Sequence, residues 1–281
     1  MKKLFFPILF LFAITINAQV DLPRVSPNAI VSQTVGYTNI TITYCRPAVH
    51  ERKIWGDLVP FDKVWRTGAN EATTIQFSTD VTVEGNKVPA GRYSLFTIPT
   101  ETEWTIIFNK TDKQWGAYNY KQDEDFVRFK AKPVKSNFIE RLQFSFSDFT
   151  DASASVLISW ENLQVAFKVE TDLFGQAYLK IKEAFAAKPD SWQNYSASAN
   201  FAADNMVFLD EAIQWADKAV SLGGGYYPYF VKAKLFFKKK YFKDALNTLD
   251  KCREIGRTDK NWDSFVSQVD FLEKQIKSNM N

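Results

Sequence analysis

The sequence predicts two domains of different classes: an antiparallel β-sandwich, or a closely related barrel, followed by an all-α segment of tetratricopeptide-like repeats. Three observations predict this arrangement. Short stretches of alternating apolar and polar residues, separated by turn residues, run from Ala29 to Val169 with no helical pattern between them. After Val169 the apolar residues recur with helical spacing. The 281 residues, 46% hydrophobic and 16% aromatic, suffice to fill two cores.

The β-rich part opens with two strands, residues 30–35 and 40–44, joined by a turn at Gly36 and Tyr37. Strict alternation in the second strand places Ile40, Ile42 and Tyr44 on one face, as expected of a half-buried sheet. A hairpin is expected at residues 81–83 and 88. Further strands, each bounded by turn residues, are expected at 73–78, 89–99, 104–109, 126–132, 139–146, 153–160 and 163–169. About ten short strands of this kind are typical of a sandwich or barrel.

The helical part is predicted to hold six helices, at residues 173–187, 190–203, 208–221, 226–239, 241–255 and 261–277. Two helix pairs repeat small and large positions at an offset of 33 residues, close to the ~34-residue tetratricopeptide period. The matching positions are Ala212 with Ala245, Ala216 with Leu249, and Ala219 with Cys252. The last helix is expected to cap this short stack. A protein or peptide partner is expected on the helical repeats.

The first 18 residues are predicted to be a signal peptide. Lys2 and Lys3 precede an apolar run from Leu4 to Ile16, and small residues end at Ala18. The run is shorter than the ~20 residues of a membrane span. The expected domains are therefore a signal peptide at residues 1–18, a β-domain at 19–170 and a helical domain at 171–281. We expect an exported protein, periplasmic or secreted, with no transmembrane segment.

Charge and cysteine usage narrow the expected partners and cofactors. Removing the signal peptide takes the formal charge from +3 to +1, which does not favour nucleic acid. Cys45 and Cys252 fall in different predicted domains and are expected to be buried free thiols. His50 is the only histidine, so a His-rich metal site is excluded, and we expect neither a metal nor a cofactor. No nucleotide-binding, zinc-protease or serine-hydrolase motif occurs, and the sequence favours a binding protein over an enzyme.

The candidate site is the irregular segment between residues 44 and 74. Arg46, Arg52 and Arg66 could bind a carboxylate or phosphate through paired hydrogen bonds, or could pair with acidic residues and hold the segment on the sandwich. Trp65 could stack on a sugar or belong to the core. The expected ligand is therefore a small anion or a sugar.

Asn70 and Glu71 complete the candidate site. They could present an amide and a general base to a substrate, with Glu71 the weak catalytic candidate, or form a turn and a salt bridge. Three hypotheses stay open: a binding module, a hydrolase that uses Glu71 with Arg46 and Arg66, and a purely structural envelope protein. The aromatic stretch 114–120 is expected either to cover a pocket or to plug the core.

Five motifs together resemble a family of exported bacterial proteins known only as a domain of unknown function. The motifs are YxRP at 44–47, RKIWGDLVPF at 52–61, VWRTGANEAT at 64–73, PAGRYSLFTIP at 89–99 and FNKTDKQWGAYNY at 108–120. The resemblance covers roughly residues 20–170 and implies a secreted, β-rich domain. Some members of the family also carry a tetratricopeptide-like segment, to which residues 171–281 are similar. The resemblance implies no reaction, and Cys45 stands where the family pattern has a small polar residue such as Ser.

Overall fold

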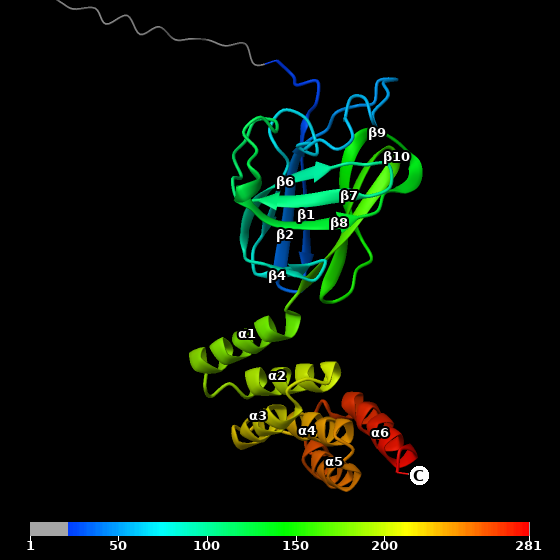
Figure 1. Ribbon diagram of the computed structural model, residues 1–281. Coiled ribbons are helices and arrows are strands. Elements are labelled where there is room, and N and C mark those ends of the chain that lie inside the picture. The colour runs from blue at the N-terminus through cyan, green and yellow to red at the C-terminus, as the bar shows by residue number, and fades with distance from the viewer. Residues whose placement is uncertain (1–21, 281) are drawn as a thin grey trace, which may run out of the picture. The chain divides into compact units, whose positions relative to one another are not determined.

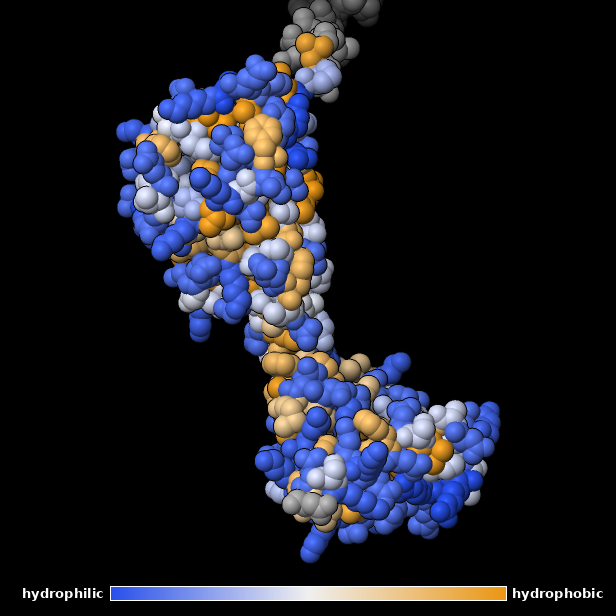
Figure 2. Space-filling model, turned by 90° about the vertical axis from the view of Figure 1, so that its right-hand side faces the viewer, coloured by the Kyte–Doolittle hydropathy of each residue, from blue (hydrophilic) through white to orange (hydrophobic). Residues whose placement is uncertain are grey.

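The computed structural model describes residues 22–280, so the predicted signal peptide lies outside the described residues. The chain divides into two compact units, one ending at Glu170 and one beginning at Thr171. We call them the β-domain and the helical domain (Figure 1). On the face in Figure 2 both units are mostly hydrophilic, with apolar residues scattered among the polar ones, as is normal for protein surfaces.

The β-domain consists of two antiparallel sheets (Figure 1). The first has six strands in the spatial order β1 (Asn28–Val35), β2 (Thr38–Cys45), β3 (Thr74–Phe77), β6 (Gly91–Ile98), β7 (Trp104–Asn109) and β8 (Asp125–Ala131). The second has the order β5 (Asn86–Val88), β4 (Val81–Val83), β10 (Ser153–Thr171) and β9 (Val134–Ser147). The predicted antiparallel β-sandwich is therefore confirmed.

One predicted break between strands is wrong. Residues 153–160 and 163–169 were expected to form two strands, but β10 runs continuously from Ser153 to Thr171 beside β9. The pairing register shifts on both sides of Glu161, which has a positive φ of 55°. On each side of Glu161, β10 advances by two residues while β9 advances by four, so the extra residues lie in β9 and β10 continues through Glu161.

The core of the β-domain draws apolar side chains from strands of both sheets. Alternation places Ile40 and Ile42 inside with no exposed surface, as predicted. Four indole rings form what we call the tryptophan cluster: Trp55, Trp65, Trp104 and Trp160. Trp65 and Trp160 stack with their ring centroids 5.8 Å apart, and Trp55 and Trp104 lie 4.9 Å apart. Two members come from the irregular segment, so this segment completes the core.

The helical domain contains six helices, as predicted (Figure 1). They are α1 (Leu173–Ala187), α2 (Trp192–Asn205), α3 (Leu209–Ser221), α4 (Tyr227–Lys238), α5 (Phe242–Gly256) and α6 (Trp262–Ser278). The six residues that repeat at an offset of 33 are all fully buried. Small side chains at five of these six positions let α3 and α5 approach their neighbours closely, which is the packing expected of paired repeat helices. α6 covers the last pair through Val269, Leu272 and Ile276.

Two further observations concern the whole described chain. Cys45 and Cys252 are buried and unlinked, and they belong to different domains. Within residues 22–280, none of the helices combines the length and the apolar character that a membrane crossing would require.

Candidate functional site

The irregular segment between β2 and β3 is held on the β-domain by main-chain hydrogen bonds to distant strands. The N–H of Val49 donates to the carbonyl of Glu140 in β9. Trp65 and Thr97 of β6 exchange two main-chain hydrogen bonds of 2.7 and 2.9 Å. These contacts satisfy the backbone of a long connection, as burial requires. They also divide its polar side chains between two cavities.

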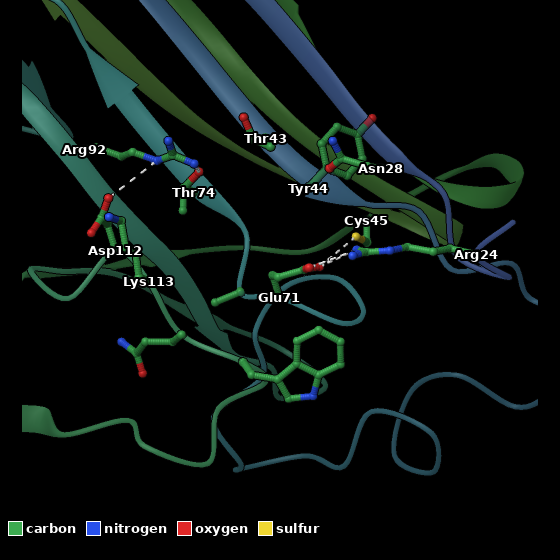
Figure 3. A pocket seen from close by; sticks show the side chains of 13 residues that line it. Arg24, Asn28, Thr43, Tyr44, Cys45, Glu71, Thr74, Arg92, Asp112 and Lys113 are labelled. Carbon is green, nitrogen blue, oxygen red and sulfur yellow. Dashed lines mark hydrogen bonds and ion pairs between the residues drawn. The ribbon is translucent and has the colours of Figure 1, made fainter. Parts of the chain in front are cut away.

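The larger cavity, about 650 Å³, lies on the outer face of the six-stranded sheet, and we call it the sheet-face cavity (Figure 3). Thr43 of β2 and Thr74 of β3 are register partners in its floor. Their neighbours Ile42 and Ile75 point into the core, so alternation turns both threonines outward. Arg92 of β6 donates from Nη2 to the Thr74 hydroxyl at 3.1 Å.

Arg24 and Glu71 form an ion pair at one end of this cavity (Figure 3). One guanidinium nitrogen of Arg24 donates to both carboxylate oxygens of Glu71, at 2.9 and 2.8 Å. The thiol of Cys45 points at the same carboxylate, with Sγ 3.6 Å from Oε2. Partial burial raises the pKa of Glu71, but hydrogen bonds from its own backbone, from Arg24 and from Cys45, with the charge of Arg24, outweigh this effect. The net pKa is lowered, so Glu71 is held as a carboxylate.

This ion pair predicts a specific loss of stability in acid. Because the folded-state pKa of Glu71 lies below its ordinary value of 4.5, the ionised group stabilises the fold above that pH. The stabilisation disappears as the pH falls through the folded-state pKa. The melting temperatures of the Glu71→Gln variant and of the unmodified chain, measured from pH 6 to pH 3, should therefore converge at the acid end of this range. Arg24→Gln should give the same convergence, and parallel curves at all pH values would contradict the assignment.

The opposite end of the sheet-face cavity carries a second cation–carboxylate pair and an exposed lysine (Figure 3). Nε of Arg92 lies 3.7 Å from a carboxylate oxygen of Asp112. Lys113 is exposed and makes no ion pair within residues 22–280. With Arg24 and Glu71 the lining holds three cations and two carboxylates, so its formal charge is +1.

The loop between β7 and β8 supplies the wall of this cavity. Asn109 fixes the loop, since its amide nitrogen donates to the carbonyl of Lys121 at 3.1 Å and its amide oxygen accepts from Gln114 at 3.1 Å. Ala117 and Tyr120 pack on an apolar patch of the outer sheet face formed by Ala72, Phe96 and Ile107. Trp115 lines the cavity and is 56% exposed. One part of the stretch 114–120 therefore walls a pocket, and another part packs on the outer face of the sheet, outside the sandwich core.

The second cavity, about 400 Å³, is lined by Arg52, Arg66 and Trp65 of the irregular segment, and we call it the arginine cavity. Val25 and Ser26, which precede β1, and Trp160 of β10 also line this cavity. Three of the candidate residues therefore share one cavity, whereas Glu71 lines the other.

The remaining two candidates are bound to backbone. Nε of Arg46 donates to the carbonyl of Leu142 in β9 at 2.9 Å. The amide nitrogen of Asn70 donates to the carbonyl of Ser26 at 3.3 Å, and the backbone of Asn70 has a positive φ of 58°. Both interactions hold the segment in place, although Arg46 binds a backbone carbonyl and not the acidic side chain that the sequence-based alternative named.

Sequence reasoning missed most of the sheet-face cavity. Arg24 is 47 positions from its partner Glu71, and no local pattern connects them. Thr43 and Thr74 could have been found, because alternation with Ile42 and Ile75 already places them on the outer face. Among residues 22–280 no group of three or more His, Cys, Asp or Glu side chains is arranged to hold a metal ion.

Comparison with known families gives one match. Residues 26–169 match the family described as Protein of unknown function (DUF2911). No curated protein and no solved structure matches the chain. The matched span covers just over half of the 281 residues and lies within the β-domain; it includes every lining residue of the two cavities except Arg24 and Val25. The resemblance seen in the motifs is thus confirmed, and the chain belongs to the DUF2911 family of proteins of unknown function.

Proposed function

We propose that this chain is an exported binding protein whose β-domain holds an acidic sugar in the sheet-face cavity. The observation that carries the proposal is the exposed indole of Trp115 beside a polar, charged sheet face. Trp115 is 56% exposed although aromatic side chains gain most from burial. A flat aromatic surface of this kind can pack against the apolar face of a sugar ring.

The polar groups of the cavity suit a ligand that both donates and accepts hydrogen bonds. Sugar hydroxyls do both, and the lining offers hydroxyl groups on Thr43 and Thr74 together with guanidinium and carboxylate groups. The Arg24–Glu71 pair fixes the direction of its donors and acceptors before a ligand arrives, which lowers the entropy cost of binding. A formal charge of +1 favours a sugar with a single carboxylate, for which exposed Lys113 is the available cation.

The hydrolase hypothesis has less support. A general acid or base works best with a pKa near the operating pH, whereas the surroundings of Glu71 lower its pKa. Arg66 lines the other cavity and Nε of Arg46 is bound to the carbonyl of Leu142, so neither is placed beside Glu71 as that hypothesis requires. A binding role needs no titrating group and agrees better with this geometry.

Export and a protein partner belong to the same proposal. Export rests on the charged start, apolar run and small-residue end of residues 1–18. Docking of a protein or peptide rests on the paired helices and on a groove of about 400 Å³ between α4 and α6. Phe230, Phe237 and Phe271 give this groove an apolar surface, and Lys234 and Lys238 border it. Apolar anchors with flanking charge suit an amphipathic peptide.

Sugar binding can be tested by calorimetric titration of the chain with glucuronate and with glucose. Glucuronate should bind more tightly, and Trp115→Ala should weaken its binding about tenfold or more, because loss of the stacking surface removes about 1.4 kcal/mol or more. The matched control is Tyr118→Ala, which removes an aromatic side chain 82% exposed in the same loop. It should change the affinity less than twofold.

Two results would count against the proposal. One is the absence of binding to either sugar and to a wider array of acidic saccharides. The other is an affinity of Trp115→Ala equal to that of the unmodified chain. Equal losses in Trp115→Ala and Tyr118→Ala would show a general effect on the loop and would also contradict a specific stacking role.

A further inference from the structure

The arginine cavity carries charged side chains of one sign only. Arg52 and Arg66 line it, and none of its described lining residues is acidic. The sheet-face cavity differs, because there two arginines each have a carboxylate partner. A cavity lined by cationic side chains without carboxylates attracts an anion from solution.

Arg66 is the key residue of this cavity. Its Nε is buried and has no hydrogen-bond partner among residues 22–280. Its guanidinium makes no ion pair with any described carboxylate, in contrast to Arg24, Arg92, Arg128 and Arg253. A buried donor without a partner is uncommon in folded proteins and calls for an explanation such as an absent ligand.

Arg52 supplies a second guanidinium whose direction is fixed. Its Nε donates to the carbonyl of Val49 at 3.0 Å and its Nη2 donates to the carbonyl of Ala48 at 2.6 Å. Arginine has five N–H groups, so these two bonds leave donors for a ligand. A guanidinium held in this way loses little side-chain entropy when it binds an oxyanion.

The remaining walls are apolar and aromatic. Trp65 and Trp160 line the cavity and belong to the rigid tryptophan cluster. Pro47, Val59 and Leu58 add aliphatic surface, and Leu58 is 44% exposed. A fully hydrated inorganic ion would leave this surface unused, whereas an organic anion would cover it. The volume of about 400 Å³ admits a molecule of one small ring with a charged group.

We propose that the arginine cavity binds a small organic anion, whose carboxylate or phosphate group is held by Arg66 and Arg52 and whose apolar or aromatic body lies against Trp65. The site is separate from the sheet-face cavity and takes a ligand of different chemistry. An oxyanion would supply the acceptors that Arg66 lacks, through the paired hydrogen bonds that guanidinium groups favour.

The test compares matched charged and neutral probes on the unmodified chain. Benzoate, phenyl phosphate and the neutral benzamide are titrated by calorimetry at low salt. At least one of the two anions should bind tenfold or more tightly than benzamide, and the stronger of the two identifies carboxylate or phosphate as the preferred group. Benzamide binding as tightly as both anions, or no binding of any probe, overturns the proposal.

Variants then place the probe. Arg66→Gln should weaken binding of the preferred anion tenfold or more, and Arg66→Lys should weaken it less, because lysine keeps the charge but loses the planar fork. Arg92→Gln is the matched control, since Arg92 lies in the sheet-face cavity, and it should change the affinity less than twofold. If Arg92→Gln weakened binding and Arg66→Gln did not, the anion would lie in the sheet-face cavity, and the proposal would be overturned.

A second measurement does not depend on how well the Arg66 variants fold. The indole N–H signal of Trp65, assigned with Trp65→Phe, should shift when benzoate or phenyl phosphate is added to the unmodified chain and should stay in place with benzamide. An unmoved Trp65 signal at saturating anion overturns the proposal. Trp115→Ala should keep its affinity for the anion, so failure of the sugar proposal and failure of this one can be told apart.

Discussion

Replacing Trp104 with alanine should lower the free energy of unfolding of the β-domain by about 3–5 kcal/mol. Trp104 is 1% exposed and contacts Trp55 and Trp65 of the tryptophan cluster, with ring centroids 4.9 and 6.3 Å apart. The substitution removes a large apolar surface from the core and leaves a cavity among rings that cannot collapse to fill it. Urea unfolding of the whole chain, followed by far-ultraviolet circular dichroism, measures the effect. The helical domain is a separate compact unit, so we expect it to have its own transition, which serves as an internal reference.

A pair of phenylalanine variants separates packing from hydrogen bonding in the same cluster. The indole nitrogen of Trp104 is buried and has no hydrogen-bond partner among residues 22–280, so Trp104→Phe removes an unsatisfied donor and should cost much less than Trp104→Ala. Trp160 donates to the carbonyl of Glu140 at 3.3 Å, and Trp160→Phe leaves that carbonyl without this partner. Trp160→Phe should therefore be the more destabilising of the two phenylalanine variants.

A loss of unfolding free energy below about 1 kcal/mol in Trp104→Ala would contradict the importance assigned to the tryptophan cluster.

The tryptophan cluster also explains how the fold supports its candidate ligand sites. Trp65 and Trp160 line the arginine cavity and also pack against the rings of the other two members of the cluster, the partly buried Trp55 and the buried Trp104. A wall fixed by core packing gives a ligand a surface that needs no reorganisation on binding. The irregular segment, which looked like a surface feature in the sequence, contributes half of this cluster.

Local pattern predicted the strands and helices because each depends on neighbours along the chain. Alternation in residues 40–44 was enough to place Ile40 and Ile42 in the core, and the offset of 33 residues was enough to identify buried positions of α3 and α5. The failure at Glu161 has the same origin. A polar residue between two apolar runs resembles a turn, and only the pairing with β9 shows that the strand continues through it.

The candidate site was predicted less well, because its geometry depends on contacts between distant residues. Carbonyl groups of β9 bind Val49 and Arg46, and Thr97 of β6 binds Trp65. These bonds set the path of the segment and separate Arg66 from Glu71, although the two are only five positions apart. Arg24, the partner of Glu71, comes from the start of the β-domain. No spacing rule within residues 44–74 contains this information.

Gly256→Ala should destabilise the helical domain by about 3 kcal/mol, at the upper end of the usual cost of overpacking. Gly256 is the last residue of α5 and is buried, and a Cβ atom at this position would overlap the indole ring of Trp262. The ring has little room to move, since it is 8% exposed and packs edge-on against Tyr226 with centroids 5.3 Å apart. In most helices alanine is favoured over glycine by about 1 kcal/mol, so a net loss here would show that close approach of α6 requires the glycine.

The double variant Gly256→Ala with Trp262→Ala identifies the overlap as the cause. Trp262→Ala alone should destabilise the helical domain by leaving a cavity between α5 and α6. In the double variant the new methyl group no longer meets the ring. The loss of unfolding free energy in the double variant should therefore be smaller than the sum of the losses in the two single variants. Simple additivity would mean that Gly256→Ala acts through another part of α5. A net gain of stability in Gly256→Ala would show that α6 can shift at little cost, and would contradict its role as a closely packed cap on the last helix pair.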